Sequence, residues 1–210
     1  MRVKVCGMTQ VGQVRELQET GVSFAGFIFY PKSPRFVEKF GLQASDLKRE
    51  KITINRVGVF VNATETEILR TVDEWRLHMV QLHGDESPKF CENVSNHITT
   101  VKAFRLGPGM NVDWKIHPYE DAVDMYLFDT VGVNYGGTGN QFDWSLLNET
   151  KITKPFFLSG GIAPGDEDQV RKFGDQHREL FSIDMNSRFE VSPGIKNIGA
   201  VKKFFRGLNG

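Results

Sequence analysis

The stretch RVGVFVNATETEILRTVDEWRLHMVQL (residues 56–82) decides the fold, because it contains one complete strand–helix–strand repeat. Residues 56–61 and 78–82 are short apolar runs without regular polar alternation, which is typical of strands buried on both faces of a parallel sheet. Between them, residues 64–75 carry apolar side chains at the period of an amphipathic helix. The order of these segments predicts a parallel sheet that is covered by helices.

Apolar runs of this kind occur eight times along the chain. The eight predicted strands are residues 3–6, 24–29, 56–61, 78–82, 100–104, 125–129, 156–159 and 180–185. Eight repeats of about 26 residues each predict an α/β fold of the (β/α)8 barrel (TIM barrel) type, slightly smaller than the roughly 250 residues typical of that fold. We therefore expect a single domain over residues 1–210, with an open doubly wound sheet as the alternative.

Capping residues mark where the helices are expected to begin and end. Thr9 is the predicted N-cap of the first helix, which should stop at Gly21. Ser87 followed by Pro88 predicts a second helix start, because serine is a good N-cap and proline suits the first helical position.

The charges of the chain balance, with 26 Lys and Arg residues against 26 Asp and Glu residues. Nucleic acid is therefore not an expected partner, because no basic field is available to attract its phosphate backbone. No apolar stretch approaches the roughly 20 residues that a membrane span needs. The two cysteines lie far apart without metal-ligand spacing, and the N-terminus does not resemble a signal peptide. These features predict a soluble, cytoplasmic protein.

The predicted barrel gathers polar residues from distant parts of the sequence at one end. In such barrels the carboxyl ends of the strands and the loops after them form the active face. The residues expected to line this mouth are Cys6, Arg35, His83, Asp129, Gly160, Gly161, Asn186 and Ser187.

Two of these residues are candidates for proton transfer. A cysteine in an apolar run is usually a small core residue, but Cys6 ends a strand, and a thiol whose pKa is lowered can act as a base or nucleophile. Cys91, on the apolar side of a predicted helix, is expected to be core. Asp129 ends the apolar run MYLFD, where burial would raise a carboxyl pKa and suit a general acid. Asp184 has a similar setting, and the residues alone do not separate the two carboxylates.

The loops after the seventh and eighth strands are a candidate phosphate site. Gly160 and Gly161, together with Asn186 and Ser187, can present backbone N–H groups to an anion. The alternative for the glycine pair is a tight turn.

Three further residues are candidate ligand contacts. Arg35 can bind a carboxylate through two parallel hydrogen bonds, although a solvated surface arginine is the simpler interpretation. Gln81 and His83 in QLHG can contact a ligand or play a structural part.

Seven stretches, taken together and in this order, resemble the phosphoribosylanthranilate isomerase family. They are VKVCGMT, GFIFYPKSPR, VGVFVN, VQLHG, LFDTVGVNYGGTGNQFDW, LSGGIAP and DMNSRFEVSPGIKN. In that family the cysteine after the first strand is the general base and the aspartate that ends the sixth strand is the general acid. The resemblance therefore implies these roles for Cys6 and Asp129.

The resemblance also implies a reaction and a mobile cover for it. The reaction is the Amadori rearrangement of N-(5-phosphoribosyl)anthranilate to 1-(2-carboxyphenylamino)-1-deoxyribulose 5-phosphate in tryptophan biosynthesis, with a small-molecule substrate, no cofactor and no metal. Gly137, in the glycine-rich stretch before FDW, is an expected substrate contact in a loop that folds over the mouth. Phe142 and Trp144 should pack inward, and Asp143 can cap the following helix. The sequence leaves open whether the protein is a monomer or a homodimer.

Two positions depart from the family pattern. Arg188 replaces a common glycine and can crowd the phosphate loop or add a cation, whereas Asn197 replaces a common aspartate and remains a good N-cap. One alternative function is another phosphosugar enzyme that uses a lysine and an acidic partner, but Lys4 and Lys102 have no obvious acidic partner in the sequence. The other is a phosphoribosyl-ligand binding module without catalysis, for which Arg188 is the only hint.

Overall fold

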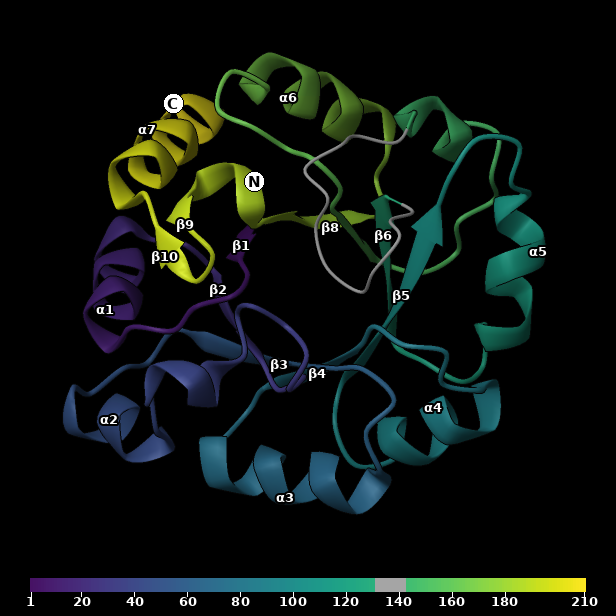
Figure 1. Ribbon diagram of the computed structural model, residues 1–210. Coiled ribbons are helices and arrows are strands. Elements are labelled where there is room, and N and C mark those ends of the chain that lie inside the picture. Colours follow the sequence, from purple (N-terminus) through teal and green to yellow (C-terminus); the bar gives the residue numbers. More distant parts are fainter. Residues whose placement is uncertain (131–142) are drawn as a thin grey trace.

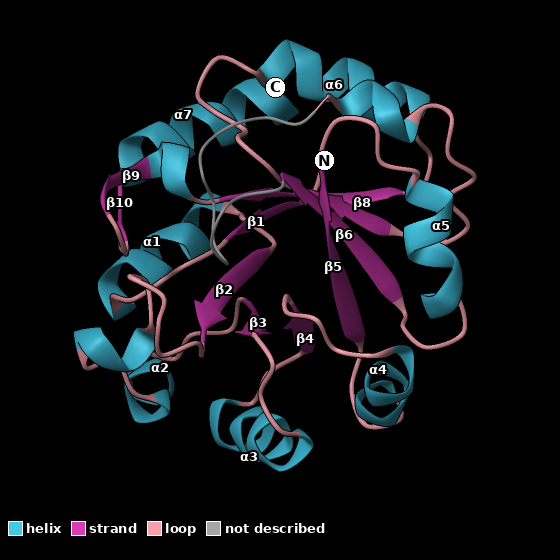
Figure 2. Cartoon of the chain, turned by 45° about the vertical axis from the view of Figure 1, so that its right-hand side comes forward, coloured by secondary structure: helices cyan, strands magenta, loops and turns pink. Residues whose placement is uncertain are grey.

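The computed structural model describes residues 1–130 and 143–210 of the chain. Within this part, eight parallel strands close into a barrel that helices surround (Figures 1 and 2). The strands are β1 (Val3–Val5), β2 (Phe24–Ile28), β3 (Asn55–Phe60), β4 (Met79–Leu82), β5 (Thr100–Leu106), β6 (Met125–Thr130), β7 (Phe156–Leu158) and β8 (Leu180–Met185). Because β1 pairs with β8, the barrel is confirmed and the open sheet is wrong.

The helices lie on the outside of the barrel, and α7 returns to pack beside α1 (Figure 1). They are α1 (Val11–Thr20), α2 (Ala44–Arg49), α3 (Glu65–Trp75), α4 (Pro88–Ser95), α5 (Val112–Ile116), α6 (Glu167–Gln176) and α7 (Ile198–Asn209). Short 3-10 turns are η1 (Val37–Phe40), η2 (His117–Tyr119), η3 (Trp144–Leu147) and η4 (Ser187–Phe189), and β9 (Glu190–Ser192) pairs with β10 (Ile195–Lys196) in a hairpin. Among the described residues, no helix combines the length and apolar character needed to cross a membrane.

Three of the predicted helix boundaries are confirmed. The Ser87 side chain accepts a hydrogen bond from the backbone of Phe90 at the start of α4. The Asn197 side chain does the same for Ala200 at the start of α7. Helix α1 ends at Gly21, whose φ of 89° lies in the left-handed region that favours glycine.

The predicted capping role of Thr9 is wrong. Helix α1 begins at Val11, after Gln10, and no side chain caps it. The hydroxyl of Thr9 donates instead to the backbone carbonyl of Gly194, in the turn between β9 and β10. The Thr9 hydroxyl therefore binds a carbonyl that is distant in sequence and is not available for the helix cap that local capping rules predict.

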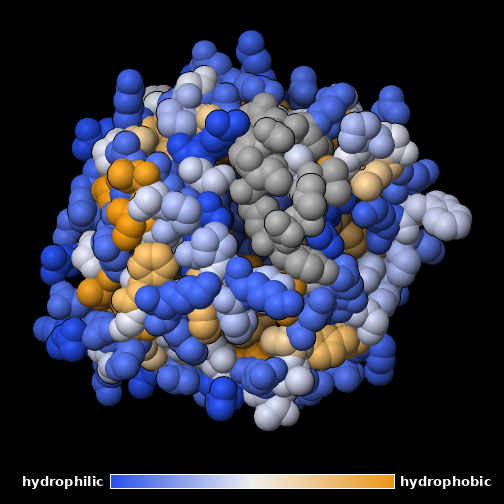
Figure 3. Space-filling view, viewed as in Figure 1, coloured by the Kyte–Doolittle hydropathy of each residue, from blue (hydrophilic) through white to orange (hydrophobic). Residues whose placement is uncertain are grey.

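The apolar core has separate layers inside and outside the barrel. The large outer cluster lies between strands and helices and contains Cys91, as expected. A second cluster combines side chains of β2, β3, β5, β6 and β7, which can meet only inside the barrel. It consists of Phe24, Val57, Val101, Ala103, Leu127 and Phe157. The face of the molecule shown in Figure 3 is mostly hydrophilic, with apolar residues in small groups.

A single methyl group tests the packing between β3 and the helix layer. A Cβ atom at Gly58 would overlap with Leu77 and lie 2.8 Å from Cε2 of Phe60, and both neighbours are buried. We expect Gly58→Ala to lower the free energy of unfolding by about 1–3 kcal/mol, the usual cost of overpacking. Urea unfolding measures it. The matched control is Gly12→Ala, where a Cβ has no neighbour within 4 Å; equal losses in both variants would contradict the packing argument.

Candidate active site at the barrel mouth

One pocket at the carboxyl ends of the strands collects every described residue that the sequence analysis placed there. It is lined by Cys6, Arg35, Gln81, His83, Asp129, Gly160, Gly161, Asn186 and Ser187, together with Ile28, Tyr30, Ser33, Val59, Val61, Ser159, Ile162 and Asp184. Gly137 lies outside the described residues, as do Phe142 and the whole glycine-rich stretch before it. The barrel therefore brings the expected groups together, while their roles stay predictions.

A buried lysine behind the pocket fixes the orientation of three polar side chains. The Lys4 ammonium donates to Oδ2 of Asp184 over 2.8 Å and to Oε1 of Gln81 over 2.7 Å. Because the amide oxygen of Gln81 accepts from the ammonium, its Nε2 donates to Nδ1 of His83, 2.7 Å away. The proton of a neutral His83 is therefore on Nε2, which lies 3.3 Å from Oδ2 of Asp129.

The structure separates the two carboxylates that the sequence left equivalent. Asp184 forms an ion pair with Lys4, and burial raises the pKa of Asp184 although Lys4 opposes the change. Asp129 accepts from the backbone N–H of Thr130 over 2.8 Å and faces the imidazole of His83. Asp184 is thus paired with a lysine ammonium, whereas Asp129 contacts a backbone N–H group and an imidazole, so the two carboxylates have different environments.

The expectation that the strand lysines lack acidic partners is wrong. Lys4 meets Asp184 because the barrel brings its first and last strands together. Lys102 on β5 lies 2.8 Å from Oε2 of Glu86, and the Glu86 carboxylate also accepts from the backbone of Gly84. Neither Lys102 nor Glu86 lines the pocket at the mouth. That pair therefore supports the loop after β4 and does not favour a lysine-dependent phosphosugar enzyme.

Arg35 is buried and is not the solvated arginine of the simpler interpretation. Its Nε and Nη2 atoms donate to the two oxygens of Glu190 over 2.9 and 2.7 Å. Lys196 also donates to Glu190, over 2.6 Å, and to Oδ1 of Asn186, over 2.7 Å. Thus Glu190 takes one edge of the guanidinium, while Nη1 of Arg35 donates to none of the described residues.

Sequence reasoning missed Glu190 and Lys196. Both belong to the stretch DMNSRFEVSPGIKN, on which the family resemblance partly rests, but the sequence does not show that the β9–β10 hairpin folds back against the mouth. The hairpin position was the missing information.

The glycine pair after β7 has a backbone suited to close approach of a ligand. Gly160 and Gly161 have φ angles of 86° and 72°, in the left-handed region. Ser187 begins the short turn η4 after β8, and Arg188 in the same turn is exposed. The two glycines therefore form a bend that borders the pocket.

The start of the segment after the undescribed residues agrees with the sequence analysis in two respects. Trp144 is buried, and the Asp143 side chain accepts a hydrogen bond from the backbone of Ser145. The segment that Asp143 caps is the short 3-10 turn η3.

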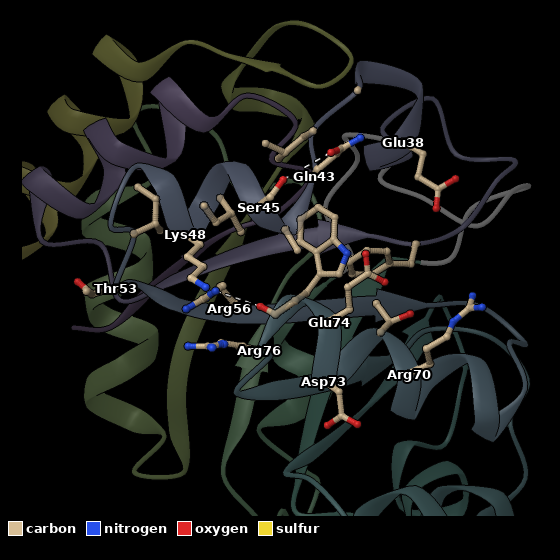
Figure 4. A pocket seen from close by; sticks show the side chains of 18 of the residues that line it. Glu38, Gln43, Ser45, Lys48, Thr53, Arg56, Arg70, Asp73, Glu74 and Arg76 are labelled. Carbon is tan, nitrogen blue, oxygen red and sulfur yellow. Dashed lines mark hydrogen bonds between the residues drawn. The ribbon is translucent and has the colours of Figure 1, made fainter.

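A larger hollow of about 1020 Å³ lies on the outer side of the barrel, between α2 and α3. Figure 4 shows Lys48, Arg56 and Arg76 in one part of it, with Asp73 and Glu38 further away. None of the residues expected at the mouth lines it, and its charged side chains are of both signs. The larger of these two hollows is therefore not the one that holds the candidate catalytic residues.

The closed barrel, with a thiol, an imidazole and two carboxylates at its mouth, has the architecture of (β/α)8-barrel enzymes and groups that are capable of acid–base chemistry. The family model described as N-(5'-phosphoribosyl)anthranilate (PRA) isomerase matches residues 3–207. The chain belongs to this family.

Relatives and solved structures agree with the family match. A curated N-(5'-phosphoribosyl)anthranilate isomerase from Parabacteroides distasonis is 39% identical over 207 residues, which cover 98% of this chain and 92% of the relative. Phosphoribosyl anthranilate isomerase from Thermotoga maritima has a TM-score of 0.84 at 32% identity, covering 100% of this chain and 99% of that chain. A phosphoribosyl anthranilate isomerase in complex with reduced 1-(o-carboxyphenylamino)-1-deoxyribulose 5-phosphate has a TM-score of 0.79 at 30% identity, with 100% and 99% coverage.

The stability contributed by Glu190 should depend on pH in a defined direction. Burial alone would raise the pKa of Glu190, but Arg35 and Lys196 outweigh burial and hold that pKa below its ordinary value near 4.5. The ionised carboxylate therefore stabilises the folded protein above about pH 4.5, and this contribution is lost as the pH falls through the folded pKa. Glu190→Gln should lower the free energy of unfolding on the order of 2 kcal/mol at neutral pH, and by less in acid.

Urea unfolding at several pH values measures this difference. Glu50→Gln is the control, because the Arg15–Glu50 pair is much more exposed and should contribute at most about 1 kcal/mol. A loss in Glu190→Gln that stays constant down to about pH 3 would show that the charge of Glu190 is not its source.

Proposed function

We propose that the protein catalyses the Amadori rearrangement of N-(5'-phosphoribosyl)anthranilate to 1-(2-carboxyphenylamino)-1-deoxyribulose 5-phosphate, a step of tryptophan biosynthesis. The observation that carries the proposal is that the thiol of Cys6 and the carboxylate of Asp129 line the same pocket from β1 and β6. These are the two residues to which the family resemblance assigns the base and the acid.

The first chemical step is opening of the furanose ring. The ring oxygen must receive a proton while the anilino nitrogen forms an iminium with C1. The backbone N–H of Thr130 and, in neutral His83, the Nε2–H group both lie close to the Asp129 carboxylate. Both groups are hydrogen-bond donors and cannot accept a proton from Asp129. A proton on Asp129 therefore finds no acceptor in either group and is available to a ligand in the pocket.

The second step is removal of the proton on C2. The iminium makes this proton acidic, so a thiolate of moderate basicity can take it and leave an enolamine. The enolamine then tautomerises to the ketone as C1 gains a proton and the C2 hydroxyl loses one. Cys6 is assigned to the C2 proton because the family resemblance gives it the role of the base and because it lines the same pocket as Asp129.

Anionic groups at the two ends of the substrate orient it across the mouth. We assign the phosphate to Gly160, Gly161, Asn186 and Ser187, where two loops present backbone groups at the pocket edge. The anthranilate carboxylate is assigned to Arg35, whose Nη1 donates to none of the described residues. The Glu190 contact holds the guanidinium in place for this second carboxylate.

A turnover assay tests the proposed function. Purified protein is incubated with freshly prepared N-(5'-phosphoribosyl)anthranilate, and loss of the anthranilate-type fluorescence is followed together with formation of the ketose. Conversion supports the isomerase. Saturable binding without conversion would reject it in favour of the phosphoribosyl-ligand binding module.

The two cysteines provide an internal comparison for the base. Cys6→Ala should lower kcat by a factor of about 100 or more, because a positioned acid–base group contributes on that scale. Cys91→Ala should leave kcat nearly unchanged, since Cys91 is a core residue of the helix layer. Steady-state kinetics with circular dichroism as a folding check measure both. Comparable losses of kcat in the two folded variants would contradict the assignment of Cys6 as the base.

The two carboxylates provide the comparison for the acid. Asp129→Asn keeps the shape of the side chain but cannot deliver a proton, so ring opening should become rate-limiting and kcat should fall at least about 100-fold. Asp184→Asn should lose less, because Asp184 is held by Lys4. If kinetics on two folded variants give the opposite ranking, the acid belongs on β8 and the assignment to β6 is wrong.

A further inference from the structure

Lys4 is a fully buried lysine that the acid–base scheme does not use. Lys4 and Cys6 are two residues apart at strand β1, so their side chains leave the same face. A Cβ atom at Gly26 of the neighbouring β2 would lie 3.0 Å from Sγ of Cys6 and 3.1 Å from Cε of Lys4. The missing side chain at Gly26 therefore leaves the space in which the thiol and the lysine meet.

The ammonium of Lys4 has three N–H donors. Two of them donate to Oε1 of Gln81 and Oδ2 of Asp184, over 2.7 and 2.8 Å. These two contacts fix the ammonium close to the space beside Gly26, which the sulfur of Cys6 also borders.

We propose that Lys4 is the positioning residue of the base and that its ammonium stabilises the thiolate form of Cys6. This inference rests on the proposed function only in naming Cys6 as the base. The ionisation of the thiol itself can be measured without substrate.

The charged groups around the sulfur act in opposite directions. Burial raises the pKa of Cys6 most strongly, Lys4 lowers it, Asp184 raises it, and Lys196 lowers it. Among these three charged groups, Lys4 has the largest effect on the pKa of Cys6. The other ionisable side chains that line the pocket are Tyr30, Arg35, His83 and Asp129.

Removal of Lys4 should therefore leave less thiolate at neutral pH. Each unit by which the pKa rises reduces the thiolate fraction about tenfold at a pH below the pKa. Lys4→Met alone would leave the Asp184 carboxylate buried without its cation, which endangers folding. The double variant Lys4→Met/Asp184→Asn removes both charges and keeps similar side-chain volumes.

The experiment measures the rate at which iodoacetamide alkylates Cys6 between about pH 6 and 10, without substrate and in a Cys91→Ala background. Lys4→Met/Asp184→Asn, shown to be folded by circular dichroism, should react about tenfold more slowly at neutral pH than Asp184→Asn, which keeps Lys4, and its midpoint should lie at higher pH than that of Asp184→Asn. Asp184→Asn alone should move the midpoint to lower pH, because Asp184 opposes the thiolate. A double variant with the same profile as Asp184→Asn overturns the proposal.

The control is Lys102→Met/Glu86→Gln, which removes another buried pair, on the opposite side of the barrel from β1. It should leave the Cys6 profile unchanged. An equal shift in both double variants would mean that lost packing sets the reactivity of Cys6, and the proposal would fall. The predicted shift in a protein that does not turn over the substrate would reject the proposed function alone.

Discussion

The ion pair between Lys4 and Asp184 crosses the seam at which the barrel closes. The two residues are 180 positions apart and face each other in the β1–β8 register. Through Gln81 the same ammonium orients His83, and His83 faces Asp129. A buried pair is weak evidence for stability, because well-packed apolar residues of similar volume often do as well. In the proposed scheme, the pair is connected both to the base, Cys6, and, through Gln81 and His83, to the acid, Asp129, which gives it a functional reason to be charged.

A second charged cluster fixes the part of the mouth that is formed after β2 and β8. Arg35, Glu190 and Lys196 join the loop after β2 to the β9–β10 hairpin, and Lys196 reaches Asn186 after β8. The groups assigned to the chemistry and those assigned to binding are therefore held by separate networks on rigid strand ends. Such an arrangement orients a substrate before reaction, so that less entropy is lost and less reorganisation is needed on the way to the transition state.

The sequence predicted the strands well because each is an unbroken apolar run buried on both faces, a local property that residues such as those of MYLFD show directly. The convergence of Cys6, His83 and Asp129 followed from the barrel rule. What could not be predicted depends on contacts between distant segments. The hydroxyl of Thr9 donates to the carbonyl of Gly194, and the ion pair with Lys4 makes Asp184 chemically different from Asp129. Local patterns carry no information about such partners.

In the proposed binding mode, one substrate spans the mouth with its phosphate at the loops after β7 and β8 and its reacting carbons between Cys6 and Asp129. A crystal structure with an unreactive reduced analogue of the ketose product would show this binding mode. We expect phosphate density at Gly160 and Ser187 and the anthranilate carboxylate at Arg35. Phosphate density at Arg35, or the analogue bound in the hollow between α2 and α3 instead of the mouth, would contradict it.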